Sequence, residues 1–181
     1  MNTCRFDVVI IGAGPAGVAA AGALAGSGLS VALLEAGVYA GAENWSGCVY
    51  FTESLAQEDC FGHRAVASAP FERRVVRRGT LVHNGLDEVG LTLTDAGTFR
   101  DCYTVLRPIY DPYFAELARS KGAALITKTT VTSLIRKAGR VVGVQASRGP
   151  LYADVVFIAE GDASHLVRSE RLERVPEPHY L

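Results

Sequence analysis

The 181-residue sequence predicts an α/β fold in which a parallel β-sheet carries helices on its faces. Residues 6–11, with the apolar run 8–11, are predicted to form a buried strand. A glycine-rich turn and a small-residue helix at about 15–27 follow it, and a second strand is expected at about 30–34. Another apolar run, at residues 155–159, has the composition of a central strand. Strands buried on both faces of a parallel sheet are apolar along their whole length, and helices connect them. The N-terminal segment is therefore expected to form a β-α-β unit.

The turn between the first strand and the first helix contains three glycines with the spacing G-x-G-x-x-G. Gly12 allows a tight turn out of the strand, Gly14 lets the backbone approach a phosphate, and Gly17 lets the helix lie close to the sheet. The helix then presents unpaired N–H groups and the positive end of its dipole. We therefore predict that a dinucleotide pyrophosphate binds at this turn, which consists of Gly12, Ala13, Gly14, Pro15, Ala16 and Gly17. The alternative is that the glycines only shape a turn.

An acidic residue follows the second strand. Glu35 lies 18 residues after Gly17, and a carboxylate at this distance can accept hydrogen bonds from both hydroxyls of an adenosine ribose. Glu35 and the adjacent Ala36 are therefore predicted to line the dinucleotide site, although an acid at the end of a strand can also be a simple solvated residue.

The composition is that of an ordinary globular protein, with 49% hydrophobic and 20% charged residues and a net charge of −1. This charge gives no electrostatic basis for binding nucleic acid or an anionic membrane surface. The apolar runs are far shorter than the roughly 20 residues that a membrane-spanning helix needs, and the N-terminus lacks the pattern of a signal peptide. The four scattered cysteines are expected to be reduced thiols of a cytoplasmic protein. The four histidines show no metal-ligand spacing, so no metal site is expected.

The middle of the sequence is predicted to leave the parallel sheet. Residues 36–50 form a Gly/Ala-rich loop that is expected to lie over the ligand, and residues 52–59 are predicted to form a short helix. β-Branched and polar residues then alternate in 73–83 and 86–94, on either side of the dipeptide Asn84-Gly85, which is typical of a tight hairpin. We therefore predict an antiparallel β segment inserted at residues 62–102.

The second half of the sequence is predicted to return to the sheet through a helix and a β-meander. Asp111-Pro112 is expected to begin a helix, with the proline at its first position, that ends at Lys121 before Gly122. The predicted strands are 103–106, 123–127, 131–136, 140–146, 151–153 and 155–159. Gly161 and Asp162 end the last strand at the carboxyl edge, where ligands bind in doubly wound sheets.

A three-stranded meander in place of a helical crossover resembles the Rossmann-like FAD-binding domain of the glutathione reductase and hydroxybenzoate hydroxylase type. Over nearly the whole chain the sequence is similar to the family of FixC, electron-transfer-flavoprotein:quinone oxidoreductases and geranylgeranyl reductases. The segments that carry this similarity are GAENWSGCVYFTESL, YTVLRPIYDPYFAELARSKGAALITKTTVTSLI and GRVVGVQASRGPLYADVVFIAEGDAS. The resemblance implies FAD as the cofactor.

The resemblance also implies roles for single residues. It places Gly12 to Gly17 at the FAD pyrophosphate, Glu35 at the ribose and the backbone of Val131 at the adenine edge. Arg107 matches the arginine of the family's V-x-R-x-x-x-D pattern, near the FAD phosphate and ribose, although an arginine that begins a helix is equally suited to the surface. Residues 44–48, which include Gly47, match the loop that approaches the flavin ring.

The sequence departs from the family pattern in two respects. The family's A-D-G-x-x-S segment reads AEGDAS at residues 159–164, so Glu160 stands where aspartate is usual, beside the expected cofactor-binding Gly161. The family's later G-D-A-A-G segment, a cysteine-rich iron–sulfur segment and a complete substrate domain do not occur. We therefore expect residues 1–181 to be an FAD/NAD(P)-binding domain that is incomplete at its C-terminus, with an open sheet edge that favours self-association.

The expected function is that of an FAD-dependent oxidoreductase, or of its FAD-binding portion. The resemblance implies electron transfer from a donor such as reduced electron-transfer flavoprotein to an acceptor such as quinone, with the cofactor carrying the redox chemistry. No residue is predicted to act as a general acid, base or nucleophile. Two alternatives are a stand-alone, non-catalytic module that binds adenine dinucleotides and an NAD(P)-dependent reductase.

Overall fold

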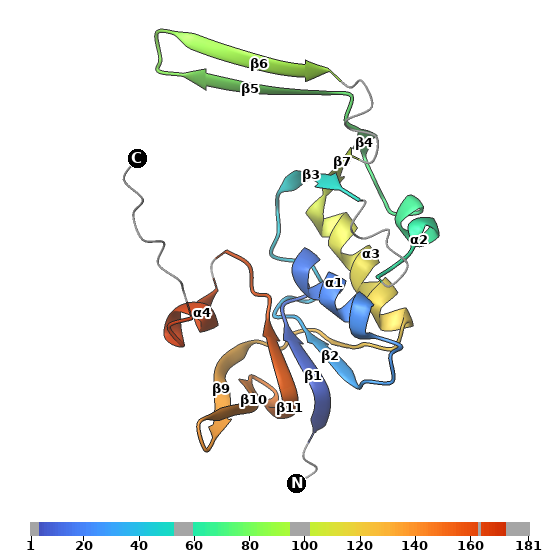
Figure 1. The fold of residues 1–181 in the computed structure, drawn as a ribbon, viewed down its shortest axis with the longest axis vertical. Coiled ribbons are helices and arrows are strands. Elements are labelled where there is room, and N and C mark those ends of the chain that lie inside the picture. The colour runs from blue at the N-terminus through green and yellow to red at the C-terminus, as the bar shows by residue number, and fades with distance from the viewer. Residues whose placement is uncertain (1–3, 53–59, 95–101, 163, 173–181) are drawn as a thin grey trace.

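A six-stranded sheet forms the centre of the protein (Figure 1). The computed structural model describes residues 4–52, 60–94, 102–162 and 164–172. The strands lie in the order β8-β2-β1-β11-β10-β9; the first four run parallel, and β10 and β9 are antiparallel. Their bounds are β1 Arg5–Ile11, β2 Val31–Leu34, β8 Ala124–Ile126, β9 Val131–Lys137, β10 Arg140–Ala146 and β11 Gly149–Ile158. This topology confirms the predicted α/β fold with a β-meander.

Three of the described helices lie on one face of the parallel strands, and the meander and the last helix lie on the other. On one face, Val8 and Ile10 of β1 pack against α1 and α3, and α2 adds Val66 to the same core. On the other face, Val9 and Ile11 pack against the meander and α4. The helices are α1 Pro15–Leu24, α2 His63–Ala67, α3 Arg107–Ser120 and α4 His165–Ser169. The parallel strands are buried on both faces, which is why their sequences are apolar throughout.

The first β-α-β unit agrees with the prediction except at the end of its helix. Helix α1 ends at Leu24, whereas the sequence prediction extended it to about residue 27. The next residue, Ala25, has extended backbone angles, and the Ser27 hydroxyl donates to the Leu24 carbonyl at 2.7 Å. Because this bond satisfies one of the last carbonyls of the helix, the chain leaves the helix one turn early.

Helix α3 begins four residues before the predicted start at Asp111-Pro112. Its first residue is Arg107, Pro108 lies in the first turn, and Pro112 lies inside the helix. A start at Arg107 places Tyr110 and Phe114 on one buried stripe against the α1 core. Pro112, near the N-terminus of the helix, removes one backbone hydrogen bond. We attribute the tolerance of that loss to the burial of the Tyr110 and Phe114 rings.

A second, three-stranded sheet covers the beginning of α3, with the order β3-β7-β4. Its strands are β3 Gly47–Phe51, β7 Cys102–Leu106 and β4 Arg73–Arg74. Tyr50 of β3 packs on Tyr110 of α3, with ring centroids 4.7 Å apart. This sheet therefore fixes the loop after β2 against the first turn of α3.

The predicted hairpin is present, but it is shorter than expected and separate from both other sheets. Strands β5 Arg77–His83 and β6 Glu88–Thr94 pair only with each other, whereas Arg73–Arg74, predicted in the same strand, pair with β7. The connection is a four-residue loop, not a two-residue turn at Asn84-Gly85. Asn84 Oδ1 accepts from the N–H groups of Leu86 and Asp87 at 2.9 and 2.7 Å, and this side-chain turn widens the loop.

Strand β11 is one strand where the sequence suggested two, at 151–153 and 155–159. Residues 149–152 pair antiparallel with β10, and from Tyr152 onward the strand pairs parallel with β1. Asp154 does not interrupt the strand because its side chain is exposed and forms an ion pair with Arg5 of β1. The helix predicted at 52–59 lies almost wholly outside the described residues.

Candidate functional site

The turn from β1 into α1 depends on two of its three glycines for its shape. Gly12 has a φ of +100°, and a Cβ there would overlap the Ala159 carbonyl at the end of β11. A Cβ on Gly17 would overlap the carbonyl oxygen of Gly12. By contrast, the nearest atom to a Cβ on Gly14 would be Arg107 Nη2, at 3.8 Å. Gly12 and Gly17 are therefore required by backbone packing, and Gly14 leaves space open above the turn.

The start of α1 presents backbone donors at this turn. Gly14 is the N-cap and provides no side-chain cap, and Pro15 is the first helical residue. The N–H groups in the first turn of a helix have no acceptor within that helix. Together with the helix dipole, they form a site that favours an anion.

Glu35 connects this turn to the loop that follows β2. Its Oε2 accepts from the Ala13 N–H at 3.0 Å, and its Oε1 accepts from the Gly37 N–H at 2.7 Å. The backbone of Glu35 also bonds to Ile126 and Thr129, near the end of β8. The carboxylate is thus held by two backbone donors beside the glycine turn. Gly37 was not predicted, and no sequence pattern that we considered indicates it.

Arg107 lies on the open side of the turn. It begins α3, and its Nε and Nη2 donate to the Asp111 carboxylate at 2.8 and 2.7 Å. This bond raises the pKa of the guanidinium, so the side chain is cationic. Its Nη2 is the atom nearest to where a Cβ on Gly14 would lie, at 3.8 Å, and 18% of the side chain is exposed.

Gly41 and Asn44 of the loop after β2 lie against Asp111, the partner of Arg107. Asn44 belongs to the loop expected near the flavin, whereas Gly41 and Asp111 were not among the predicted site residues. Asp111, expected to cap α3, is 2% exposed and has Asn44 Nδ2 at 3.4 Å from its Oδ2. Gly41 has a φ of +81°, and a Cβ there would lie 2.8 Å from Asp111 Cβ. The loop therefore packs directly on the ion pair. The i,i+4 spacing of an arginine and an aspartate was the signal that could have indicated this pair.

Cys48 and two tyrosines lie beneath the same loop. Burial raises the pKa of the Cys48 thiol, and the nearby Arg107 charge opposes that effect. Burial also raises the pKa values of Tyr50 and Tyr110 above the ordinary value of 10.0. All three side chains are therefore neutral at pH 7. None of them is activated as a nucleophile.

The segment after β11 closes the other side of the turn. Glu160 Oε2 accepts from the Ser164 hydroxyl at 2.6 Å and from the Leu166 N–H at 3.0 Å, and the Ser164 hydroxyl caps α4 through the Val167 N–H. The glutamate in place of the family's aspartate is thus able to cap the helix. Gly161, with a φ of +83°, has open space around it.

The remaining predicted residues lie at the start of strands or loops. Gly47 begins β3, and Val131, which is buried, begins β9. Ala36 is exposed beside Glu35.

No group of three or more His, Cys, Asp or Glu side chains in the described ranges is arranged to hold a metal ion. Within those ranges, no helix is both long and apolar enough to cross a bilayer.

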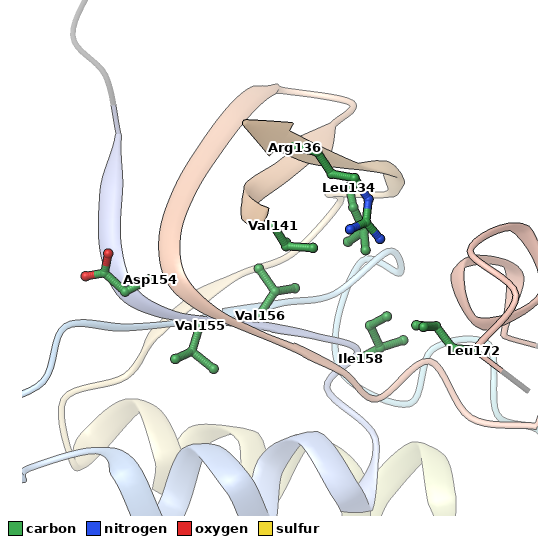
Figure 2. A pocket seen from close by; sticks show the side chains of 8 residues that line it. All are labelled: Leu134, Arg136, Val141, Asp154, Val155, Val156, Ile158 and Leu172. Carbon is green, nitrogen blue, oxygen red and sulfur yellow. The ribbon is translucent and has the colours of Figure 1, made fainter. Parts of the chain in front are cut away.

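A separate pocket of about 460 Å³ lies between the meander and α4, away from the glycine turn (Figure 2). Figure 2 shows Val141 and Val156 facing each other across it, with Leu172 beside Ile158. Its two charged residues are already paired, Arg136 with Glu170 and Asp154 with Arg5. None of the predicted site residues lines this pocket.

Three features define a Rossmann-like dinucleotide-binding domain. They are the glycine turn between parallel strands, the acid after the second strand, and the meander that precedes the last parallel strand. The family model described as FAD dependent oxidoreductase matches residues 7–165. The chain belongs to this family, and FAD is the family's cofactor.

Curated relatives agree with the resemblance found in the sequence. The chain is 33% identical to "Protein FixC" of Azorhizobium caulinodans, over 98% of this chain and 41% of that protein. It is 36% identical to the Escherichia coli protein named "Probable electron transfer flavoprotein-quinone oxidoreductase YdiS", over 99% of this chain and 42% of that protein. The chain thus spans about two fifths of the length of these relatives.

Solved structures with the same fold include oxidoreductases and halogenases. A geranylgeranyl bacteriochlorophyll reductase-like protein from Thermoplasma acidophilum has a TM-score of 0.69 and 22% identity, over 92% of this chain and 42% of that chain. The myxobacterial chondrochloren halogenase CndH, described as a variant of FAD-dependent halogenases, has a TM-score of 0.67 and 20% identity, over 92% of this chain and 39% of that chain. At these identities the similarity shows the fold.

Proposed function

We propose that this chain is the FAD-binding part of an oxidoreductase and that the ADP half of FAD lies along the carboxyl ends of β1 and β2. The observation that carries this proposal is that three groups converge at that edge. They are the Gly12–Gly17 turn, the Glu35 carboxylate bonded to Ala13, and the Arg107 guanidinium next to Gly14. Ligands of doubly wound sheets bind at this edge.

The pyrophosphate is assigned to the glycine turn. The N–H groups at the start of α1 point toward an anion in this position, and Gly14 carries no side chain that would block it. A guanidinium has five N–H donors, and Asp111 engages those on Nε and Nη2. Donors therefore remain on Arg107 for a phosphate oxygen.

The adenosine is assigned to the side of Glu35. Each oxygen of a carboxylate has two lone pairs, and each Glu35 oxygen uses one for a backbone N–H. The second lone pairs are available to the two ribose hydroxyls. Ala36, which is exposed, and the backbone of Val131 would line the adenine.

The flavin end is assigned to Gly47 and Gly161. Gly47 pairs with Leu106, the residue before Arg107, and Gly161 follows the end of β11; neither carries a side chain that would obstruct a ring. Glu160 acts through its cap on α4, which positions the backbone of Gly161. When bound, FAD supplies reversible two-electron chemistry, and the protein binds and orients it.

The electron donor and acceptor are proposed from the relatives. A reduced electron-transfer flavoprotein is the donor class, and a quinone is the acceptor class, because the curated relatives bear these names. We assign residues 1–181 to the dinucleotide-binding domain and 62–102 to an insertion in it. A cytoplasmic location is proposed because none of the four cysteines forms a disulfide.

Calorimetric titration of the purified chain with FAD, ADP and NAD+ tests this assignment. Binding of FAD and ADP, with NAD+ bound no tighter than ADP because it carries the same ADP half, would support it, together with the yellow absorption of any flavin that copurifies. Equal affinities for FAD and ADP would mean that only the ADP half contacts the chain, as in the non-catalytic module. Preferential binding of NAD+, or no binding of FAD or ADP, would contradict the proposal.

A further inference from the structure

The loop at the tip of the β5–β6 hairpin contains the dipeptide Asn84-Gly85. The paired residues of the two strands end at His83 and Glu88, so residues 84–87 form the loop. Figure 1 shows the hairpin projecting beyond β4 and β7, and all four loop residues are exposed. Water therefore reaches both the Asn84 side chain and the backbone of Gly85.

Gly85 presents an unshielded backbone nitrogen next to the Asn84 side chain. An asparagine carboxamide and the nitrogen of the following residue are separated by the bonds that close a five-membered ring. Glycine has no Cβ to crowd that approach, and it can adopt backbone angles that other residues avoid. Gly85 has a φ of +96°, and no atom beyond its chain neighbours lies within 4 Å of where its Cβ would be. Attack by this nitrogen on the Asn84 carboxamide is therefore sterically open.

Two backbone donors converge on the oxygen of that carboxamide. Asn84 Oδ1 accepts from the N–H groups of Leu86 and Asp87 at 2.9 and 2.7 Å. The Asn84 N–H donates in turn to the Asp87 carbonyl at 3.1 Å, which closes the loop and holds the donors in place. Two donors about 2.7–3.1 Å from a carbonyl oxygen form an oxyanion hole, which stabilises the negative charge that develops on that oxygen during attack.

We propose that Asn84 is a self-modification site, at which the Gly85 nitrogen attacks Asn84 Cγ and closes a succinimide ring. The Gly85 nitrogen gives its proton to solvent, the Cγ–Nδ2 bond breaks, and Nδ2 takes up a proton and leaves as ammonia. Water then opens the ring at either carbonyl, which leaves aspartate or isoaspartate at this position. Water is the only co-reactant, and nothing is oxidised or reduced. Either product adds a negative charge beside Asp87 and Glu88.

Timed incubation of the purified chain in mildly alkaline buffer, followed by peptide mapping with mass spectrometry, tests the proposal. Asn84 should be converted, whereas Asn44, which precedes the bulky Trp45, should keep its amide over the same interval. The chain unfolded in guanidinium chloride keeps the dipeptide but loses the two donors. Asn84 should react about tenfold more slowly there, because one hydrogen bond to a charged group amounts to roughly that factor in rate.

A matched pair of glycine variants tests the role of Gly85. Gly85→Ala places a methyl group beside the attacking nitrogen and disfavours a positive φ, so it should suppress the conversion of Asn84. Gly90→Ala makes the same change in β6, where the nearest atom to the new Cβ is Leu81 Cδ1 at 3.5 Å, and should keep the wild-type rate. Circular dichroism verifies the fold of both variants. An Asn84 no more reactive than Asn44, equal or faster conversion in the unfolded chain, or a wild-type rate in Gly85→Ala would overturn the proposal.

Discussion

Asp111 holds the Arg107 side chain against the glycine turn from one helical turn away. Two of its bonds to Arg107 are 2.8 and 2.7 Å long, and only 1% of the Asp111 side chain is exposed, against 18% for Arg107. The guanidinium is therefore fixed by a buried acid, and the same Nη2 that donates to Asp111 is the atom nearest to where a Cβ on Gly14 would lie, at 3.8 Å. This geometry makes Arg107 important both for stability and, in our proposal, for phosphate binding.

Removing only one charge of this pair should be costly. Arg107→Met leaves the buried Asp111 carboxylate with the Asn44 amide at 3.4 Å, and we expect the free energy of unfolding to fall by about 3 kcal/mol. The double variant Arg107→Met/Asp111→Asn removes both charges and should recover most of that loss. Urea denaturation measures both values, and a double variant no more stable than the single one would contradict the expectation.

A control for this experiment exists on the same helix. Arg119 and Glu116 form an ion pair whose side chains are 59% and 57% exposed. Solvent screens such pairs, so Arg119→Met should leave the free energy of unfolding close to that of the wild type.

Replacing Glu35 with Gln should weaken binding of both ADP and FAD. The variant loses the charged acceptor for the ribose and sets an amide N–H₂ against one of the two backbone donors, Ala13 or Gly37. A lost charge-assisted bond costs about 1.5–3 kcal/mol, which is roughly tenfold to a hundredfold in affinity. Calorimetry gives the dissociation constants. Glu43→Gln, which makes the same charge change at an exposed position of the adjacent loop, should bind as the wild type does; an unchanged constant for Glu35→Gln would place the ribose elsewhere.

Gly14→Val should abolish dinucleotide binding without unfolding the sheet. Gly14 has ordinary extended backbone angles and open space above it, so valine fits the protein but occupies the phosphate position. We expect a loss of at least about 100-fold in ADP affinity, because several donors can no longer reach the phosphate. Gly79→Val, in the remote strand β5, is the matched control. Wild-type affinity in Gly14→Val would refute the pyrophosphate assignment.

The buried tyrosines should make the protein sensitive to alkaline pH. Burial raises the pKa values of Tyr50 and Tyr110 above 10.0 in the folded chain, so the unfolded state loses these protons first. Their contribution to stability is complete below about pH 10 and declines as the pH rises above it. Urea denaturation at several pH values should show this decline, with a smaller slope in Tyr110→Phe. Tyr39→Phe, at an exposed position, should keep the wild-type slope.

The first β-α-β unit was predictable because its determinants are local. Strand period, glycine spacing and the position of Glu35 after β2 all depend on residues close together in the chain. The three glycines illustrate the limit of that prediction. A Cβ at position 12 would overlap the Ala159 carbonyl, which makes Gly12 indispensable. Ala159 comes from the far end of the sequence.

Elements with two plausible starts were decided by packing. Either Pro108 or Pro112 suits the first turn of a helix, and the burial of Tyr110 against Tyr50 and Phe114 selects the earlier one. Likewise, Asp154 reads as a break between two strands, but its partner Arg5 on β1 keeps β11 continuous.

By itself, the sequence determined the α/β class, the glycine turn and the acid that follows β2, because short-range backbone geometry dictates each of them. Tertiary structure alone decided which groups surround the turn. Gly41 and Asn44 meet Asp111 only when the loop after β2 packs on α3, and β4, which precedes the hairpin in sequence, pairs with β7 and not with a hairpin strand. These contacts join residues far apart in the chain, and their energies depend on burial and charge pairing that exist only after folding.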